Sequence, residues 1–243
     1  PTTVTRSVTE TIRNVNVLVF NAQGNLIGST YNDSAPTSVS VPVRISSGCT
    51  ICAIANTGSG TYFDGISTLT ELKAKATTAV TDPTAIADIM YGEQSSVNIT
   101  SSTASQDIKV KRLYSKYTFT ITPSSDITIT GYRLCNVPNK CYIASGNTDN
   151  PTTGFSGLDY SAVTTSVATG ATVTAGPYYI YENLAGTNSA SNTAELRTSG
   201  NATSGASYLL ITATSKVGVG AGWASTYRVY LGGVTNATPP VLD

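Results

Sequence analysis

Apolar and polar residues alternate in short stretches along most of the 243-residue chain. Alternation with a period of two is typical of β-strands that bury one face. It is clearest in residues 38–45, SVSVPVRI, where Pro42 cannot donate a ladder hydrogen bond and therefore predicts an edge position. The pattern predicts strands at residues 14–20, 25–31, 38–45, 50–56, 96–100, 108–122, 127–134, 141–144, 178–182, 208–214 and 227–231.

The strand predicted at residues 14–20, NVNVLVF, differs from the others. Val15, Val17 and Val19 share one face, and the opposite face is also apolar toward its end. A strand that is apolar on both faces is typical of the centre of a sheet. We therefore expect these residues to lie centrally in a hydrophobic core.

One helix is predicted among the strands. Thr68 and Glu71 have the spacing of a capping box, and the apolar stripe that follows predicts a helix to about Thr78. Pro83 predicts a second, shorter helical turn that ends near Met90.

A polar break at residues 101–106, SSTASQ, predicts a domain boundary. Within residues 108–122 the apolar positions change phase near Arg112, which predicts a bulge or a strand that bends between two sheets. The predicted fold is mainly β, with two β-sandwiches in tandem: residues 1–103, which carry the inserted helix, and residues 104–243.

Charged residues make up only 12% of the chain, so its polarity comes mostly from Ser, Thr, Asn and Gly, as in many extracellular β proteins. The formal net charge is +0, which gives no broad basic field for nucleic acid. Lys109, Lys111, Arg112 and Lys116 form a small basic cluster, which we interpret as the solvated face of a strand. No apolar run approaches the ~20 residues that cross a bilayer, and the first residues do not resemble a signal peptide, so we expect a mature or trimmed form of an exported protein.

The chain contains no histidine. This excludes Ser-His-Asp and Cys-His catalysis, in which imidazole carries the proton, and most zinc and copper sites. A pair of carboxylates suffices for glycoside hydrolysis, but no short motif gathers the acidic residues. We therefore expect no enzyme, no catalytic residues, no metal and no cofactor.

Four cysteines permit three pairings, and the sequence leaves the choice open. Cys135 and Cys141 flank a Pro-containing turn, and a hairpin there would bring their Cα atoms to roughly 5–6 Å, within disulfide range. Cys49 and Cys52 lie three apart in an extended stretch, on opposite faces, which favours buried free thiols.

Seven segments in order and spacing across nearly the whole chain resemble the fimbrillins, the type V pilins of the Bacteroides group. They are TIRNVNVLVFNAQGNL, AIANTG, STLTELKA, IKVKRLYSKYTFTI, YYIYEN, ASYLLITAT and TYRVYLG. The resemblance implies two transthyretin-like β-sandwich domains and a structural pilus subunit at the cell surface. It also implies export across the outer membrane as a lipoprotein precursor, whose lipid anchor is the sole membrane contact.

The resemblance further implies cleavage by an Arg-specific protease ahead of the first core strand, here between Arg6 and Ser7. Removing the N-terminal strand would open a groove at the core strand that carries Val15, Val17 and Val19. A strand from a neighbouring subunit would fill it, satisfying both the unpaired backbone and the apolar cleft. Such a head-to-tail contact builds an open filament. Family subunits that donate a strand continue further than Asp243, so we expect an acceptor whose donor strand is removed or absent.

Two further expectations concern the surface. Ser34, in Asp33-Ser34-Ala35, fits an O-glycosylation pattern of the same bacteria. An alternative function is a tip or surface adhesin that binds a host protein or glycan. This alternative requires an exposed aromatic platform, for which the candidates are Trp223, Tyr178, Tyr179 and Tyr181.

Overall fold

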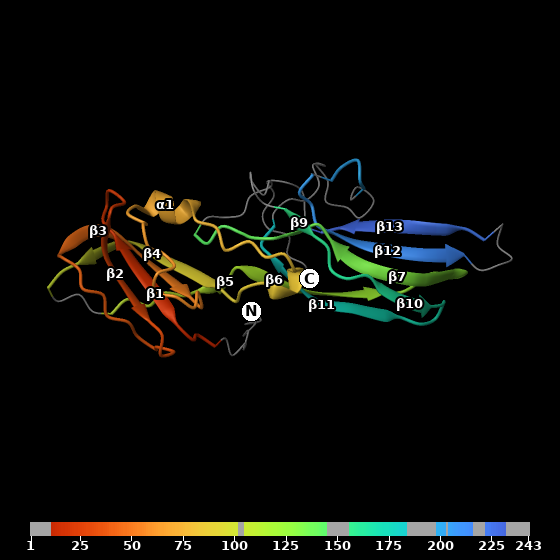
Figure 1. Ribbon diagram of the computed structural model, residues 1–243, viewed down its shortest axis with the longest axis horizontal. Helices are drawn as coiled ribbons and strands as arrows, with labels where there is room; N and C mark the ends of the chain where they lie inside the picture. The colour runs from red at the N-terminus through yellow and green to blue at the C-terminus, as the bar shows by residue number, and fades with distance from the viewer. Residues whose placement is uncertain are drawn as a thin grey trace, which may run out of the picture. The chain divides into compact units, whose positions relative to one another are not determined.

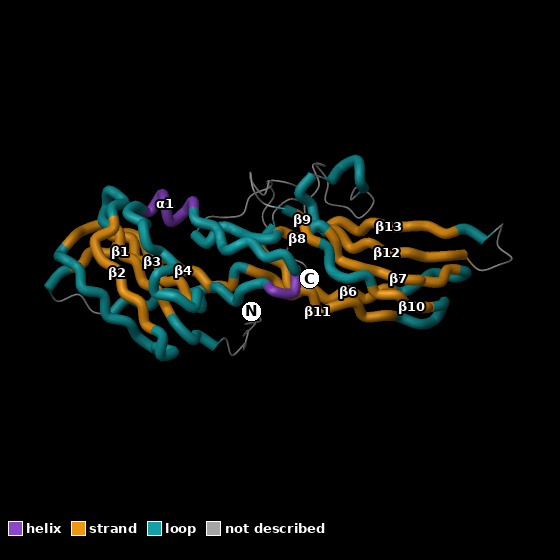
Figure 2. The backbone as a smooth tube through the Cα atoms, viewed as in Figure 1, coloured by secondary structure: helices purple, strands orange, loops and turns teal. Residues whose placement is uncertain are grey.

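A computed structural model describes residues 11–101, 105–144, 156–183, 198–202, 204–215 and 222–231. The chain is mainly β, with short helical segments (Figures 1 and 2). It divides into two compact units. Unit 1 comprises residues 1–75 and 87–113, and unit 2 comprises residues 76–86 and 114–243. The domain limits expected from the sequence, 1–103 and 104–243, stay a prediction.

Unit 1 is built on a five-stranded antiparallel sheet in the order β2-β1-β3-β4-β5. As expected, β1 lies inside this sheet, and all six of its residues are buried. The elements of unit 1 are β1 (Val15–Phe20), β2 (Leu26–Asn32), β3 (Ser46–Ala55), α1 (Leu69–Ala74), β4 (Met90–Ile99) and β5 (Lys111–Arg112).

Helix α1 begins at the predicted capping box. The Glu71 amide donates to Thr68 Oγ1 at 3.2 Å, and the Thr68 amide donates to Glu71 Oε2 at 2.9 Å. Hydrogen bonds to the Glu71 carboxylate, first from the Ser67 amide, lower the pKa of Glu71. The helix ends at Ala74 rather than near Thr78, because the Thr77 amide donates instead to the Cys141 carbonyl at 2.8 Å.

Unit 2 has a four-stranded antiparallel sheet in the order β10-β7-β12-β13 and two small two-stranded sheets, β11-β6 and β8-β9. The chain changes sheets at Leu113, since β5 pairs with β4 and the next strand, β6, pairs with β11, which confirms the bend predicted near Arg112. The elements are η1 (Pro83–Ala85), β6 (Tyr114–Ile121), β7 (Ile127–Cys135), β8 (Val137–Pro138), β9 (Gly157–Leu158), β10 (Val163–Val167), β11 (Val173–Tyr181), β12 (Tyr208–Ser215) and β13 (Ala224–Tyr230).

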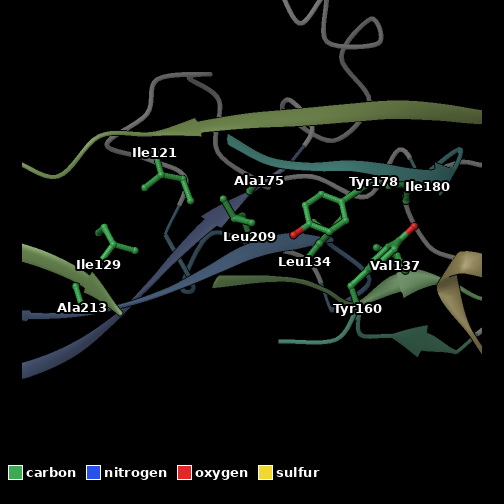
Figure 3. Close-up of a cluster of buried hydrophobic side chains, with 10 residues drawn as sticks. All are labelled: Ile121, Ile129, Leu134, Val137, Tyr160, Ala175, Tyr178, Ile180, Leu209 and Ala213. Atoms are coloured by element: carbon green, nitrogen blue, oxygen red, sulfur yellow. The ribbon is translucent and has the colours of Figure 1, made fainter. Parts of the chain in front are cut away.

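The core of unit 2 lies between the four-stranded sheet and the β11-β6 pair. Figure 3 shows it from Ile121 and Tyr178 on one side to Leu134 and Leu209 on the other. Tyr160, expected from the sequence as an anchor, is buried there. Its hydroxyl oxygen lies 2.7 Å from the Tyr179 carbonyl oxygen and 3.1 Å from the Pro83 carbonyl oxygen, so it fastens residues 76–86 to β11.

Two expectations fail along the chain. Residues 141–144 do not form a strand, although Tyr142 makes an isolated bridge with Ala76. Residues 38–45, the clearest alternating stretch, pair with no other described strand. They belong to the link between the end of β2 and the start of β3. Because β2 and β3 lie on either side of β1, this link must cross β1 in a layer outside the sheet.

Candidate strand-acceptor site

The three valines expected to line an acceptor groove share one face of β1. Val15 and Val17 pack with Ala55 and Met90, and Val19 packs with a second cluster. Both edges of β1 are hydrogen-bonded, to β2 and to β3. Strand β1 therefore supplies the floor of an apolar layer but offers no edge of its own. We call these three residues the floor valines.

Residues 38–45, the cover segment, lie on this floor. Val39, Val41 and Val43 are half-buried, and the residues between them are exposed. Val39 and Val41 pack on the cluster that contains Val15 and Val17. Val41 and Val43 pack on the cluster that contains Val19. The cover segment thus has the side-chain pattern of a strand that buries one face.

The backbone of the cover segment has no strand partner in the described part of the chain. None of residues 38–45 makes a backbone hydrogen bond to any residue in the described part of the chain. A strand with an apolar face and unpaired amide and carbonyl groups is a template for adding another strand. The sequence predicted the alternation correctly but could not show that the described residues provide no partner strand.

Gly28 on β2 brings the cover segment close to the sheet. A Cβ at this position would lie 2.8 Å from the Pro42 carbonyl oxygen and 3.3 Å from Val41 Cγ1, and would also meet Val43. Any larger residue would push the segment away from β2. Glycine is therefore required here by close approach of two backbones.

Hydrogen bonds and an ion pair hold the chain in place just before β1. The Arg13 amide donates to Asn56 Oδ1 at 2.9 Å, and Asn56 Nδ2 donates to the Thr11 carbonyl at 3.1 Å. Arg13 also forms an ion pair with Asp88, with Nη1 and Oδ2 3.4 Å apart. Arg6 and Ser7, the expected processing site, lie outside the described residues.

Unit 2 has an incomplete layer of its own. Among the described strands, β6 pairs only with β11, and β13 pairs only with β12. The arches from β6 to β7 and from β10 to β11 lie side by side, because Thr169 Oγ1 donates to the Ser124 carbonyl at 3.1 Å. Since β7 lies between β10 and β12, the unpaired edge of β6 is on the side of β12 and β13.

The inner face of β13 is exposed where such a layer would cover it. Leu209 and Ile211 on β12 pack in the core, and they pair in register with Val229 and Tyr227. Val229 and Tyr227 therefore face the same side, yet they are 44% and 42% exposed. Trp223 follows the same alternation and is 40% exposed. Trp223, Tyr227 and Val229 form the β13 row. Sequence reasoning named Trp223 as a candidate exposed aromatic but missed Tyr227 and Val229, although all three lie at odd positions of the alternation.

The Cys135–Cys141 disulfide that the sequence permitted is not formed, since all four cysteines are free and buried thiols. The turn between them does not close a hairpin. Val137 pairs with Leu158 instead, and the Cys141 amide donates to Thr77 Oγ1 at 3.2 Å. Burial raises the pKa of the Cys141 thiol to about 12, so it stays protonated near neutral pH. The free, buried state expected for Cys49 and Cys52 is what the structure shows.

The aromatic candidates for a glycan platform do not gather on one surface. Tyr178 and Tyr181 are buried, and only Tyr179 and Trp223 are exposed. Tyr179 is on β11, where its ring meets Tyr114 edge-on at 5.6 Å between centroids. Trp223 precedes β13 in the other sheet. An aromatic surface in unit 2 would therefore consist of separate residues.

Ser34 lies in the exposed loop after β2, where its hydroxyl donates to Asn32 Oδ1 at 2.7 Å. Its glycosylation stays a prediction. In the basic cluster, Lys109, Lys111 and Lys116 are exposed, and Arg112 pairs with Asp88 at 3.3 Å.

Within the described ranges, no group of three or more His, Cys, Asp or Glu side chains is arranged to hold a metal ion. None of the helices described is long and apolar enough to cross a membrane.

Comparison with solved structures shows which fold this is. A protein from Bacteroides eggerthii with a provisional cell-adhesion assignment is 17% identical, with 90% of this chain and 72% of that chain covered and a TM-score of 0.53. The tip fimbrial protein Mfa3 from Porphyromonas gingivalis, truncated at its C-terminus, is 13% identical, with 90% and 76% covered and a TM-score of 0.56. At such identities the likeness shows the fold alone: the chain has a fimbrillin-like fold, as the sequence resemblance implied.

Sequence comparison adds one domain match. Residues 178–238 match the model of a domain of unknown function, DUF4906. The matched region contains β12 and β13, and so includes the β13 row. None of the curated proteins matches the sequence.

Proposed function

We propose that this chain is a subunit of a cell-surface fimbria that assembles by accepting a strand from a neighbouring subunit. The observation that carries the proposal is the cover segment, an alternating strand whose valines are packed and whose backbone has no partner among the described residues. The fimbrillin-like fold is consistent with it, since one solved relative is a tip fimbrial protein. The non-enzymatic role expected from the absence of histidine is part of the proposal.

The β13 row supports the same function from unit 2. An exposed apolar row on the inner face of an edge strand is a hazard that monomeric proteins usually cover. A strand laid beside β6 would cover Tyr227 and Val229 and would pair with the unpaired edge of β6. The donor is thus an extended segment with alternating apolar residues, contributed by another subunit.

Processing between Arg6 and Ser7 prepares the subunit. Asn56 and Asp88 hold the chain at Arg13, immediately before β1. The segment that carries Arg6 precedes these contacts in the sequence. Cleavage there removes residues 1–6 without disturbing β1. Export across the outer membrane as a lipid-anchored precursor completes this scheme.

The test is to express the chain with and without any native C-terminal continuation, treat each form with trypsin, and analyse the products on denaturing gels. The proposal predicts a ladder of multimers from the form with the continuation after cleavage at Arg6. The N-terminal residue of the ladder subunits should be Ser7. The absence of multimers in both forms contradicts strand acceptance, and subunits that retain residues 1–6 within assembled multimers contradict the processing step.

Adhesion at a fimbrial tip is a second candidate, favoured by the exposure of Trp223 and by the tip protein among the solved relatives. A host protein or glycan would then bind the surface around this indole. Binding to a glycan array that is lost in Trp223→Ala, with multimer formation unchanged, would favour adhesion. Loss of multimers with no glycan binding by the wild type would favour assembly.

A further inference from the structure

The two edges of the cover segment differ in their hydrogen-bonding groups. In an extended strand, the amide and carbonyl of successive residues point to opposite edges. One edge of the segment therefore carries the backbone groups of Val39, Val41 and Val43, and we call it the valine edge. The other edge carries those of Ser38, Ser40, Pro42 and Arg44, and we call it the proline edge.

The proline edge cannot form a complete ladder. Pro42 has no backbone N–H, so a strand that paired along this edge would meet a gap in the middle of its contact. A carbonyl left without a donor in a buried ladder costs about 1–3 kcal/mol. The valine edge has an N–H and a C=O at each of its three positions.

The proline edge is also turned toward the sheet. The Pro42 carbonyl oxygen would lie 2.8 Å from a Cβ on Gly28, which places this oxygen directly over β2. Among the described strands, β2 is the outermost on that side of the sheet, since it pairs with β1 alone. The proline edge therefore lies along the outer strand β2, and the valine edge is directed away from β2.

We propose that the strand accepted by unit 1 pairs with the valine edge and lies over the side of the floor away from β2. This inference rests on the proposed function, which requires a partner strand but does not say where it pairs. Its apolar side chains would extend the layer formed by Val39, Val41 and Val43 on the floor valines. The partner is recognised by its main chain along about five residues, and by small apolar side chains at alternate positions.

Amide hydrogen exchange resolved by residue tests this assignment. The probe is a synthetic peptide of four valine–threonine pairs with a lysine at each end, added to the trypsin-treated full chain. We expect the amides of Val39, Val41 and Val43 to exchange at least about tenfold more slowly with the peptide present, and those of Ser38, Ser40 and Arg44 to change little. Slowing confined to the proline edge, equal at both edges, or absent at both overturns the proposal.

Three variants give an independent reading of the same assignment. Val41→Pro removes a donor from the valine edge, Val41→Ala removes packing but keeps the donor, and Ser40→Pro adds the same ring on the proline edge. We expect Val41→Pro to weaken peptide binding about tenfold relative to Val41→Ala. Ser40→Pro should bind within about twofold of wild type. Equal weakening by the two proline variants, with equal melting temperatures, contradicts the assignment.

These outcomes separate the inference from the proposed function. Multimers that form on trypsin treatment without protection of the valine edge would leave strand acceptance standing and remove only this choice of edge. Protection of the valine edge by the peptide, in a chain that never forms multimers, would support the edge and contradict assembly.

Discussion

In the described part of the chain, the cover segment of unit 1 and the β11-β6 pair of unit 2 each lie over a multi-stranded sheet, but the apolar faces beneath them differ in exposure. In unit 1 the floor valines are buried, and the cover segment lies over them. In unit 2 the β13 row stays 40–44% exposed beside the unpaired edge of β6. The hydrophobic effect drives both faces to be covered. Unit 1 covers its face with its own chain, although the backbone of the cover segment has no partner among the described residues. In unit 2 the described residues leave both the side chains of the β13 row and the edge of β6 uncovered.

The difference has a consequence for specificity. Main-chain pairing is indifferent to sequence, while pockets for side chains select a partner. If strands are accepted as proposed, unit 1 offers them mostly backbone groups, and unit 2 offers an aromatic and aliphatic surface that can discriminate among strands. Trp223 and Tyr227 provide the large contact area that is typical of binding hot spots.

The largest expected effect contrasts a floor valine with a member of the β13 row. Val17→Asp puts a carboxylate in a site that is only 7% exposed and should cost about 3 kcal/mol or more of unfolding free energy. Val229→Asp, at 44% exposure, should change it by about 0.5 kcal/mol or less in the monomer. Urea denaturation of the two variants measures the contrast. Similar losses in both would show that the β13 row is covered in the monomer.

An intermediate effect is expected at Gly28. Gly28→Ala should destabilise unit 1 by about 1–3 kcal/mol, because the new methyl group meets the Pro42 carbonyl and the valines of the cover segment. Gly222→Ala in unit 2 is the matched control, since a Cβ there meets no atom within 4 Å. Thermal melts of both variants check the prediction. A harmless Gly28→Ala would mean that the cover segment is not held against β2.

The smallest expected effect is a pH dependence that arises from Glu71 in unit 1. The pKa of Glu71 is lowered in the folded state by the amide of Ser67 and further hydrogen bonds. Its ionised form therefore stabilises the fold above the unfolded pKa, and this contribution is lost as the pH falls through the folded pKa. Glu71→Gln should lower the melting temperature slightly at pH 7, with the difference from wild type shrinking toward pH 3. A difference that stays constant with pH would assign the effect to packing.

Local sequence rules predicted the features that depend on neighbouring residues. The capping box at Thr68 and Glu71, the central position of β1 and the change of sheet near Arg112 are all decided by short-range patterns, and the structure confirms them. The predictions for features that depend on distant partners were wrong. The helix stops early because Thr77 pairs with Cys141, and that same pairing draws Cys141 away from Cys135.

The proposed acceptor site was predictable only in part. The floor valines followed from alternation and family resemblance, but the unpaired state of the cover segment depends on what lies beside it, which a sequence does not state. Tyr227 and Val229 of the β13 row were missed because their register with Leu209 and Ile211 decides that their side chains face inward. Without that register, the alternation along β13 does not tell which of its two faces is turned toward the core.

Site-specific photo-crosslinking between subunits tests strand acceptance most directly. A photoreactive side chain placed at Val229, in cells that display the protein, should yield covalent dimers and higher multimers. The same group at Thr226, which is exposed on the outer face of β13, should yield few. Crosslinked multimers from position 229 alone are the predicted result, and equal crosslinking from both positions, or none from position 229, would contradict the account.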